Sequence, residues 1–173
     1  MSTPLISRGV GGHQSARSQT DSWLTPPHII TTLGGPDSFD LDPCAFPGWA
    51  TAKRGICLPD DGLAAEWEGR VWLNPPYGSE TFDWLDRLAD HGTGTALIFA
   101  RTETSGFVRA VWRRATALLF IEGRLHFHRP NGVRAVANSG APSVLVAYGA
   151  ADAAILRRCS IPGAYVPLAE VES

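Results

Sequence analysis

The segment that most constrains this chain is an apolar run that stops abruptly at two prolines, Val71-Trp72-Leu73-Asn74-Pro75-Pro76-Tyr77-Gly78. Residues 71–73 are good strand formers and predict the end of a buried strand. Pro75 and Pro76 have no backbone N–H and a fixed φ, so the strand must end there in a stiff turn. Because the residue before a proline is held in extended geometry, Asn74 is predicted at the strand tip. Open α/β sheets bind ligands at such carboxyl ends.

The groups at this tip suit a planar ligand that carries an exocyclic NH2 group. The side-chain oxygen of Asn74 and the carbonyl of Pro75 can accept its two N–H hydrogens. Tyr77 can stack on the ring of the ligand. The alternative is an ordinary Pro-Pro turn, in which Asn74 makes a local turn bond and Tyr77 packs as a surface aromatic.

Two earlier segments also predict carboxylates near a ligand-binding edge. Phe39 and Leu41 alternate with two aspartates before Pro43 closes the strand, which places Asp42 at a strand's carboxyl end. The turn at 60–62 can expose the carboxylate of Asp61. For both segments, turn or capping chemistry alone is the competing explanation.

The order of the remaining elements predicts the fold class. Helices are expected over 26–33, 80–91, 105–114 and 152–158, and strands over 39–42, 57–58, 71–73, 95–100, 117–121 (running on toward 128) and 143–148. This alternation predicts an α/β three-layer sandwich with a mostly parallel sheet, in which 95–100 lies parallel to 71–73. Residues 1–20 are predicted to be a flexible tail, 21–160 the single domain and 161–173 a C-terminal tail.

Charge is distributed unevenly along the chain. Residues 1–100 hold six basic and twelve acidic residues, whereas 101–134 hold seven arginines against two glutamates. An acidic first half joined to an arginine-rich segment predicts one basic face, as nucleic-acid-binding proteins have. The alternative is a solvated helix surface with scattered arginines.

Cysteine, histidine and hydropathy patterns exclude several classes of protein. Three cysteines without C-x-x-C spacing predict neither a disulfide framework nor a zinc site, and the five histidines do not cluster at metal-ligand spacing. No signal peptide is evident, and no apolar run approaches the ~20 residues that a membrane span needs. We therefore expect a cytoplasmic, reduced protein with no metal and no membrane partner.

Taken in order, three motifs resemble those of the phage-type DNA N-6-adenine methyltransferases (the Dam family): W-x-T-P at 23–26, D-x-D-P-C-A at 40–45, and N-P-P-Y at 74–77. The resemblance spans residues 22–149 and includes D-G-L at 61–63, Trp67, G-R-L-x-F at 123–127 and Pro142-Ser143. It implies a Rossmann-like S-adenosylmethionine-dependent methyltransferase fold. It also implies methyl transfer to the exocyclic amine of an adenine flipped out of double-stranded DNA, in the host cytoplasm if the protein is phage-encoded.

The resemblance also assigns residues to roles. The catalytic residues it implies are Asn74, Pro75, Pro76 and Tyr77. The cofactor contacts it implies are Trp23, Thr25, Pro26, Asp42, Pro43, Cys44 and Ala45. The carboxylate of Asp61, in the turn at 60–62, is a further cofactor contact that it implies. Arginines of the 101–134 segment are candidates for DNA contacts, namely Arg101, Arg124, Arg129 and Arg134.

One departure from methyltransferases of this broad fold concerns the turn after the first strand. Phe46-Pro47-Gly48 stands where a glycine-rich turn is usual, and the stretch from Asp42 to Asn74 is short. We therefore expect the second strand and its ribose-binding acid to be reduced or rebuilt.

Three other functions use parts of the same pattern. RNA and protein methyltransferases share N-P-P-Y, and a catalytically degenerate fold of this kind could bind nucleic acid through its arginines alone. Pro43-Cys44 matches the nucleophile of C5-cytosine methyltransferases, although that chemistry leaves N-P-P-Y unexplained.

Overall fold

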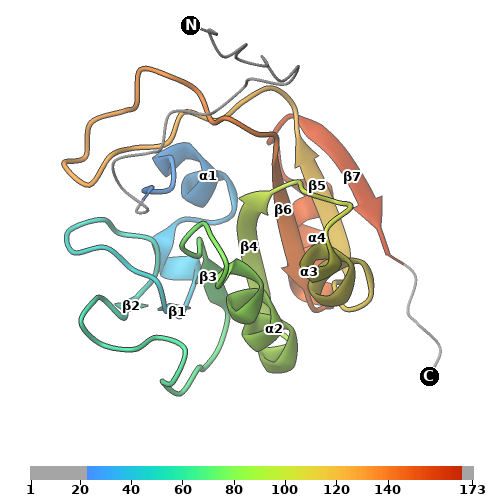
Figure 1. Cartoon of the computed structure of the whole chain (residues 1–173), viewed down its shortest axis with the longest axis horizontal. Coiled ribbons are helices and arrows are strands. Elements are labelled where there is room, and N and C mark those ends of the chain that lie inside the picture. Colours follow the sequence, from blue (N-terminus) through green and yellow to red (C-terminus); the bar gives the residue numbers. More distant parts are fainter. Residues whose placement is uncertain (1–22, 169–173) are drawn as a thin grey trace, which may run out of the picture.

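The computed structural model describes residues 23–168, which form a sheet covered by helices on both faces (Figure 1). The strands are β1 (Leu41–Asp42), β2 (Arg54–Gly55), β3 (Val71–Leu73), β4 (Gly94–Phe99), β5 (Ala117–Ile121), β6 (Ser143–Tyr148) and β7 (Gly163–Pro167). The helices are α1 (Pro27–Thr32), α2 (Thr81–His91), α3 (Ser105–Phe107) and α4 (Ala150–Arg158), with a 3-10 turn η1 (Pro36–Ser38) and a π-helical turn η2 (Val108–Trp112). Among these residues, no helix is long and apolar enough to cross a membrane.

The sheet has a parallel half and an antiparallel half, in the order β2-β1-β3-β4-β6-β5-β7. Strands β2, β1, β3 and β4 run parallel, so the predicted parallel pairing of β3 with β4 is confirmed. From β4 onward each neighbour is antiparallel. The prediction of a mostly parallel sheet was therefore wrong. The reason is that β5 returns to β6 through a loop with no crossover helix, and parallel neighbours need such a crossover.

Side chains alternate across the sheet and so build two separate cores. In β3, Val71 and Leu73 pack on the face that carries α2, while Trp72 packs on the face that carries α1 and α4. Leu85 of α2 and Ile29 of α1 are both fully buried against their faces. Burial on both faces explains why the central strands are continuous apolar runs.

Three elements differ from the sequence prediction. The second strand lies at 54–55 rather than at 57–58, and β5 ends at Ile121 instead of running on toward 128. Residues 163–167, predicted to be part of a tail, form β7 and pair with the whole of β5. This edge strand is mostly exposed or half-buried, so its sequence lacks the apolar signal of a core strand. The predicted tail at 1–20 and the end of the chain at 169–173 lie outside the described residues.

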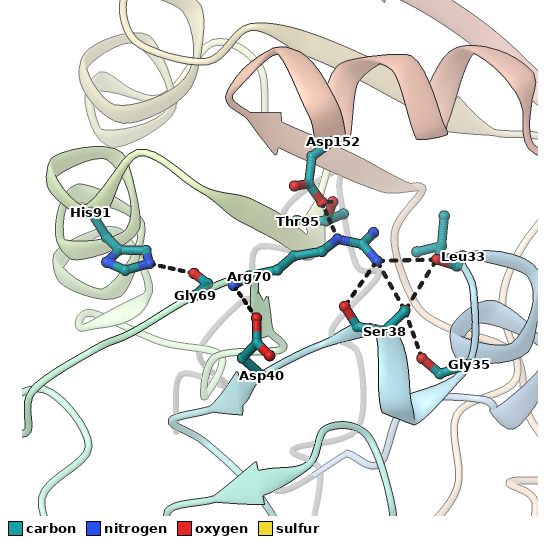
Figure 2. A network of polar contacts seen from close by, with 9 residues as sticks. All are labelled: Leu33, Gly35, Ser38, Asp40, Gly69, Arg70, His91, Thr95 and Asp152. Carbon is teal, nitrogen blue, oxygen red and sulfur yellow. Dashed lines mark hydrogen bonds and ion pairs between the residues drawn. The ribbon is translucent and has the colours of Figure 1, made fainter.

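A buried ion pair between Arg70 and Asp152 lies just before β3, at the end of the strand opposite Asn74. Figure 2 shows the contacts that Arg70 makes there. Arg70 Nε donates to Asp152 Oδ1 of α4 over 2.8 Å, and Thr95 Oγ1 of β4 donates to the same oxygen over 2.7 Å. Arg70 Nη1 donates to Ser38 Oγ of η1 over 2.9 Å, and the guanidinium lies 3.8 Å from the centre of the Phe39 ring. One guanidinium therefore holds η1, β3 and α4 together.

Candidate active site

The side-chain amide of Asn74 is held in one orientation directly after β3, as predicted for the strand tip. Its Nδ2 donates to the carbonyl of Trp23 over 2.7 Å and to Thr25 Oγ1 over 3.2 Å. Because a backbone carbonyl can only accept, the atom facing Trp23 must be the nitrogen of the amide. Oδ1 is therefore the accepting atom on the other side of the amide, and the Tyr77 hydroxyl donates to it over 3.5 Å.

Thr25 connects the W-x-T-P segment to β3. It is 2% exposed, and its Oγ1 accepts hydrogen bonds from both Asn74 Nδ2 and Trp72 Nε1, the latter over 3.3 Å. Trp49 Nε1 donates to the carbonyl of Thr25 over 2.9 Å. Thr25 thus orients the Asn74 amide, a role that the sequence motif did not reveal.

The Tyr77 ring packs against protein on at least one face. It stacks on Phe99 with a centroid distance of 4.3 Å and an interplanar angle of 14°, and it meets Phe127 edge-on at 6.2 Å. Burial raises the pKa of the Tyr77 hydroxyl, so the group stays protonated and donates. The predicted stacking of Tyr77 on a ligand therefore cannot use the ring face that Phe99 covers.

A cavity of about 660 Å³ opens beside Asn74 and brings the separate motifs together. The predicted residues that line it are Trp23, Thr25, Asp42, Pro43, Cys44, Ala45, Asp61, Asn74, Pro75 and Pro76. Pro26 instead lines a second, smaller cavity, and Tyr77 lines neither cavity but contacts Asn74 in the wall of the larger one. The volume lies in the range of small-molecule and cofactor sites.

Asp42 places a buried carboxylate in the wall of the larger cavity. It is 3% exposed; Oδ1 accepts from the Cys44 N–H over 2.9 Å, and Oδ2 accepts from Thr51 Oγ1. Burial raises the pKa of Asp42 to about 6, because no cation pairs with it within residues 23–168. A cationic ligand in the cavity would supply the missing counter-charge.

Asp61 and Gly62 also line the larger cavity. Asp61 Oδ1 accepts from the backbone N–H groups of Leu63 and Ala64, over 2.9 and 3.3 Å, which leaves Oδ2 for a ligand. A Cβ at Gly62 would lie 2.0 Å from the Pro43 carbonyl oxygen. Only glycine allows this close approach of the two loops. The glycine of the D-G-L motif is therefore required because a side chain would not fit, and not because the backbone has a positive φ.

The Cys44 thiol is not activated as a nucleophile. Burial, and to a lesser extent the Asp42 carboxylate, raise the pKa of Cys44 above its usual range, so the thiol stays protonated. A nucleophilic cysteine needs the opposite shift. The described part of the chain also contains no group of three His, Cys, Asp or Glu side chains that could hold a metal ion.

Sequence reasoning missed several residues around the larger cavity, among them Trp49, Thr51 and Trp84. Trp49 and Thr51 lie in an irregular stretch without periodicity, so no pattern indicated their contacts with Thr25 and Asp42. Trp84 was hidden within α2, whose apolar face was predicted from other residues. Its Nε1 is buried and has no hydrogen-bond partner among the described residues.

The arginines of 101–134 divide between two places. Arg109 and Arg114 form ion pairs with acidic residues of α2, and the pair of Arg109 with Asp86 measures 2.8 Å. These two arginines therefore do not contribute to the single basic face that was predicted. The four DNA-contact candidates are exposed and make no ion pair within the described residues. They are Arg101, after β4, and Arg124, Arg129 and Arg134, in the loop after β5.

That loop carries a short hairpin at the carboxyl edge of the sheet, drawn in orange beside α1 (Figure 1). The Gly132 N–H donates to the Arg129 carbonyl over 2.7 Å, and the Arg129 N–H donates to the Val133 carbonyl over 2.9 Å. Gly132 has φ +81°, as the turn requires. Val133 is 58% exposed and Val136 is 91% exposed, so the hairpin presents apolar side chains between its arginines.

Comparison with known proteins places these motifs in one family. The family model described as DNA N-6-adenine-methyltransferase (Dam) matches residues 12–162, most of the chain. The chain belongs to this family. A DNA N-6-adenine-methyltransferase of Haemophilus phage HP1 (strain HP1c1) is 35% identical over 66 residues, which is 36% of this chain and 38% of the phage protein. The match thus spans less than half the length of this Dam-family relative.

Proposed function

We propose that this Dam-family chain transfers a methyl group from S-adenosylmethionine to the N6 nitrogen of an adenine in DNA. The observation that carries the proposal is the orientation of Asn74, which lines the larger cavity and whose Nδ2 is engaged by Trp23 and Thr25, so that Oδ1 is the amide atom left to accept from a ligand. The family match and the name of the phage relative support adenine as the target.

The larger cavity fits the proposed methyl donor in size and chemistry. S-adenosylmethionine carries a sulfonium and an ammonium group, and the wall holds a buried Asp42 carboxylate without a paired cation. Trp84 Nε1 is an unpaired donor in the same wall, suited to an acceptor on the ligand. Asp61 Oδ2 can accept from ligand hydroxyl or amine groups. When bound, this cofactor supplies an electrophilic methyl group.

Asn74 and Pro75 then orient the acceptor of that methyl group. The lone pair of the adenine amine is delocalised into the ring, which makes N6 a poor nucleophile. Asn74 Oδ1 and the Pro75 carbonyl, which has no partner within the described residues, accept the two N6 hydrogens and favour a more localised lone pair. Orientation of this kind lowers the barrier without a covalent intermediate.

The adenine must leave the duplex to reach the strand tip. The hairpin beside the cavity offers groups for this step, because Arg129 and Arg134 can contact phosphates and the exposed Val133 can pack against bases. Arg101 and Arg124 extend the same edge. These contacts would position the duplex without reading its sequence.

The proposal is tested by transfer of a labelled methyl group from S-adenosylmethionine to unmethylated duplex DNA, followed by mass spectrometry of the nucleosides. We expect N6-methyladenine in the DNA and no label in RNA or protein offered in parallel. Label in RNA or protein alone would contradict the DNA assignment. Cofactor binding without any transfer would indicate a degenerate binding module.

Thr25→Val should lower kcat by about tenfold, because the variant keeps the shape of the side chain but removes the acceptor that holds Asn74 Nδ2. The dissociation constant of S-adenosylmethionine should change much less, and Thr25→Ser should restore kcat. The measurement is steady-state kinetics beside calorimetric titration of the cofactor. Equal losses of kcat and cofactor affinity would instead make Thr25 a cofactor contact.

Lowering the pH from 7 to 5 should weaken cofactor binding by up to about tenfold, because Asp42, with its pKa raised to about 6, loses its charge in this window. Asp42→Asn should bind the cofactor weakly at both values. Titration calorimetry at several pH values checks this. A wild-type pH dependence that persists in Asp42→Asn would show that another group is responsible.

The same substitution should have the opposite effect on stability. A carboxyl whose pKa is higher in the folded state than in the unfolded chain costs stability as the pH rises from 3.8 to about 6. Asp42→Asn should therefore raise the free energy of unfolding at pH 7.5 by at most about 3 kcal/mol, and by little near pH 4. Urea unfolding at the two pH values measures the difference.

A further inference from the structure

A second cavity, of about 370 Å³, lies on the other side of the segment that carries Thr25. Leu24 and His128 exchange backbone hydrogen bonds of 2.8 and 3.1 Å, and this bridge separates the two cavities. The larger cavity contains Thr25 in its wall, and the second cavity contains the next residue, Pro26. The proposed methyl-transfer chemistry takes place at the larger cavity, whereas the wall of the second cavity holds Arg124 and Arg134, two of the arginines proposed to contact DNA.

The walls of the second cavity combine apolar and basic groups. Ile29, Ile121 and Ile161 contribute the apolar part. The charged and titratable groups that face it are His28 from α1, together with Glu122, Arg124, His126, His128 and Arg134 from the loop after β5. Two guanidinium groups and three imidazoles thus face a single carboxylate. Neither arginine forms an ion pair within residues 23–168.

Within residues 23–168, the two arginines make no ion pair with a carboxylate, and one of the imidazoles has a ring nitrogen without a hydrogen-bond partner. His128 Nδ1 is buried and makes no hydrogen bond among the described residues. Burial, then the charges of Arg134 and His28, lower the pKa of His128. Like charges gathered around a partly desolvated imidazole are unfavourable unless an anion joins them. His126 differs, because its Nδ1 lies 3.2 Å from the Ala135 carbonyl and is already paired.

We propose that the second cavity binds the phosphate of a nucleotide. Arg124 and Arg134 would supply charge-assisted hydrogen bonds to the phosphate oxygens, with His128 Nδ1 as a further donor. The three isoleucines in the wall would contact the sugar and base attached to the phosphate. A site for inorganic phosphate alone would need neither this apolar surface nor a cavity of this volume. The nucleotide is either part of the DNA strand beside the methylated adenine or a free nucleotide. In its DNA form the inference rests on the proposed function.

The test follows histidine resonances by NMR while thymidine 5′-monophosphate, inorganic phosphate or a short single-stranded oligonucleotide is added to the full chain. We expect saturable shifts of His126 and His128, a rise in the pKa of His128, and weaker binding as the pH rises from 6 to 8. His91, the last residue of α2, whose Nε2 lies 2.7 Å from the Gly69 carbonyl, lines neither cavity and should not move.

Variants show whether the two arginines carry the binding. Arg124→Gln and Arg134→Gln should each weaken it by about tenfold or more, since each removes a charged donor. Arg113→Gln is the matched control, because Arg113 is equally exposed and lies away from both cavities. Unchanged affinity in both arginine variants would overturn the proposal.

The ligands separate the two sources of phosphate. Shifts with the mononucleotide support a small-nucleotide site, whereas shifts with the oligonucleotide alone support a site for the DNA strand. No shift with any of the three ligands would overturn the proposal. Cofactor binding is measured separately by calorimetry. Loss of cofactor binding with histidine shifts intact would contradict the proposed function and leave the second cavity's assignment standing.

Discussion

Asn74→Ala should reduce kcat for methyl transfer by about 100- to 1000-fold, a loss typical of removing one preorganised hydrogen-bonding group from an active site. The reason is that Asn74 Oδ1 is one of only two acceptors proposed for the N6 hydrogens, and its direction is set by the bonds of Nδ2 to Trp23 and Thr25. Single-turnover transfer to a duplex oligonucleotide is the measurement, since it isolates the chemical step from product release.

Two controls make the Asn74 result specific. Cofactor affinity should stay close to the wild-type value, because Asn74 contributes only one end of the larger cavity. Asn138→Ala serves as a matched substitution, since Asn138 is exposed and lines neither cavity. Turnover of Asn74→Ala equal to that of the wild type would rule out the proposed role of the strand tip.

Arg70→Met should lower the free energy of unfolding by about 3–5 kcal/mol, the usual cost of removing one partner from a buried ion pair. The variant would leave the Asp152 carboxylate, which is 1% exposed, without its guanidinium. It would also break the contacts of Arg70 with Ser38 and Phe39 that fasten η1 to the sheet (Figure 2). Urea unfolding followed by circular dichroism measures the change.

A double-mutant cycle separates the pair from general loss of packing. Asp152→Asn added to Arg70→Met should cost less than the sum of the two single changes, because it removes the unpaired charge. Arg54→Met is the matched control, since Arg54 pairs with Glu68 over 3.1 Å with side chains 48% and 73% exposed, and should cost less than about 1 kcal/mol. Similar losses for Arg70 and Arg54 would contradict a special role for the buried pair.

Sequence reasoning located the elements that local chemistry specifies. The end of β3 and the start of α2 were predicted because prolines and helix periodicity act within a few residues. Strand β7 was missed because its residues pack weakly, and its place is set by backbone pairing with β5 from Ala117 to Ile121. The antiparallel half of the sheet was missed for a similar reason, since strand direction depends on which neighbour a strand meets.

Sequence reasoning predicted many of the residues that line the larger cavity, but not the contacts that these residues make. Most residues assigned from the family motifs do line it, yet Pro26 belongs to the second cavity and Tyr77 packs on Phe99. Trp49, Thr51 and Trp84 had no motif to mark them. The arginine-rich segment likewise gave no sign that Arg109 and Arg114 would be neutralised by acids of α2, which lie far away in the chain.

The sequence by itself determined that a buried strand ends at Asn74 and that an asparagine stands at its tip, because two prolines constrain the backbone covalently. It also determined the family, because the spaced motifs are properties of the chain. Only the tertiary structure decided which atom of the Asn74 amide is left to accept hydrogen bonds from a ligand, since the deciding partner, the Trp23 carbonyl, lies 51 residues away. Only folding buries the Asp42 carboxylate away from any cation of residues 23–168, and only folding gathers the basic groups of the second cavity. Both depend on residues that are distant in the sequence and neighbours in space.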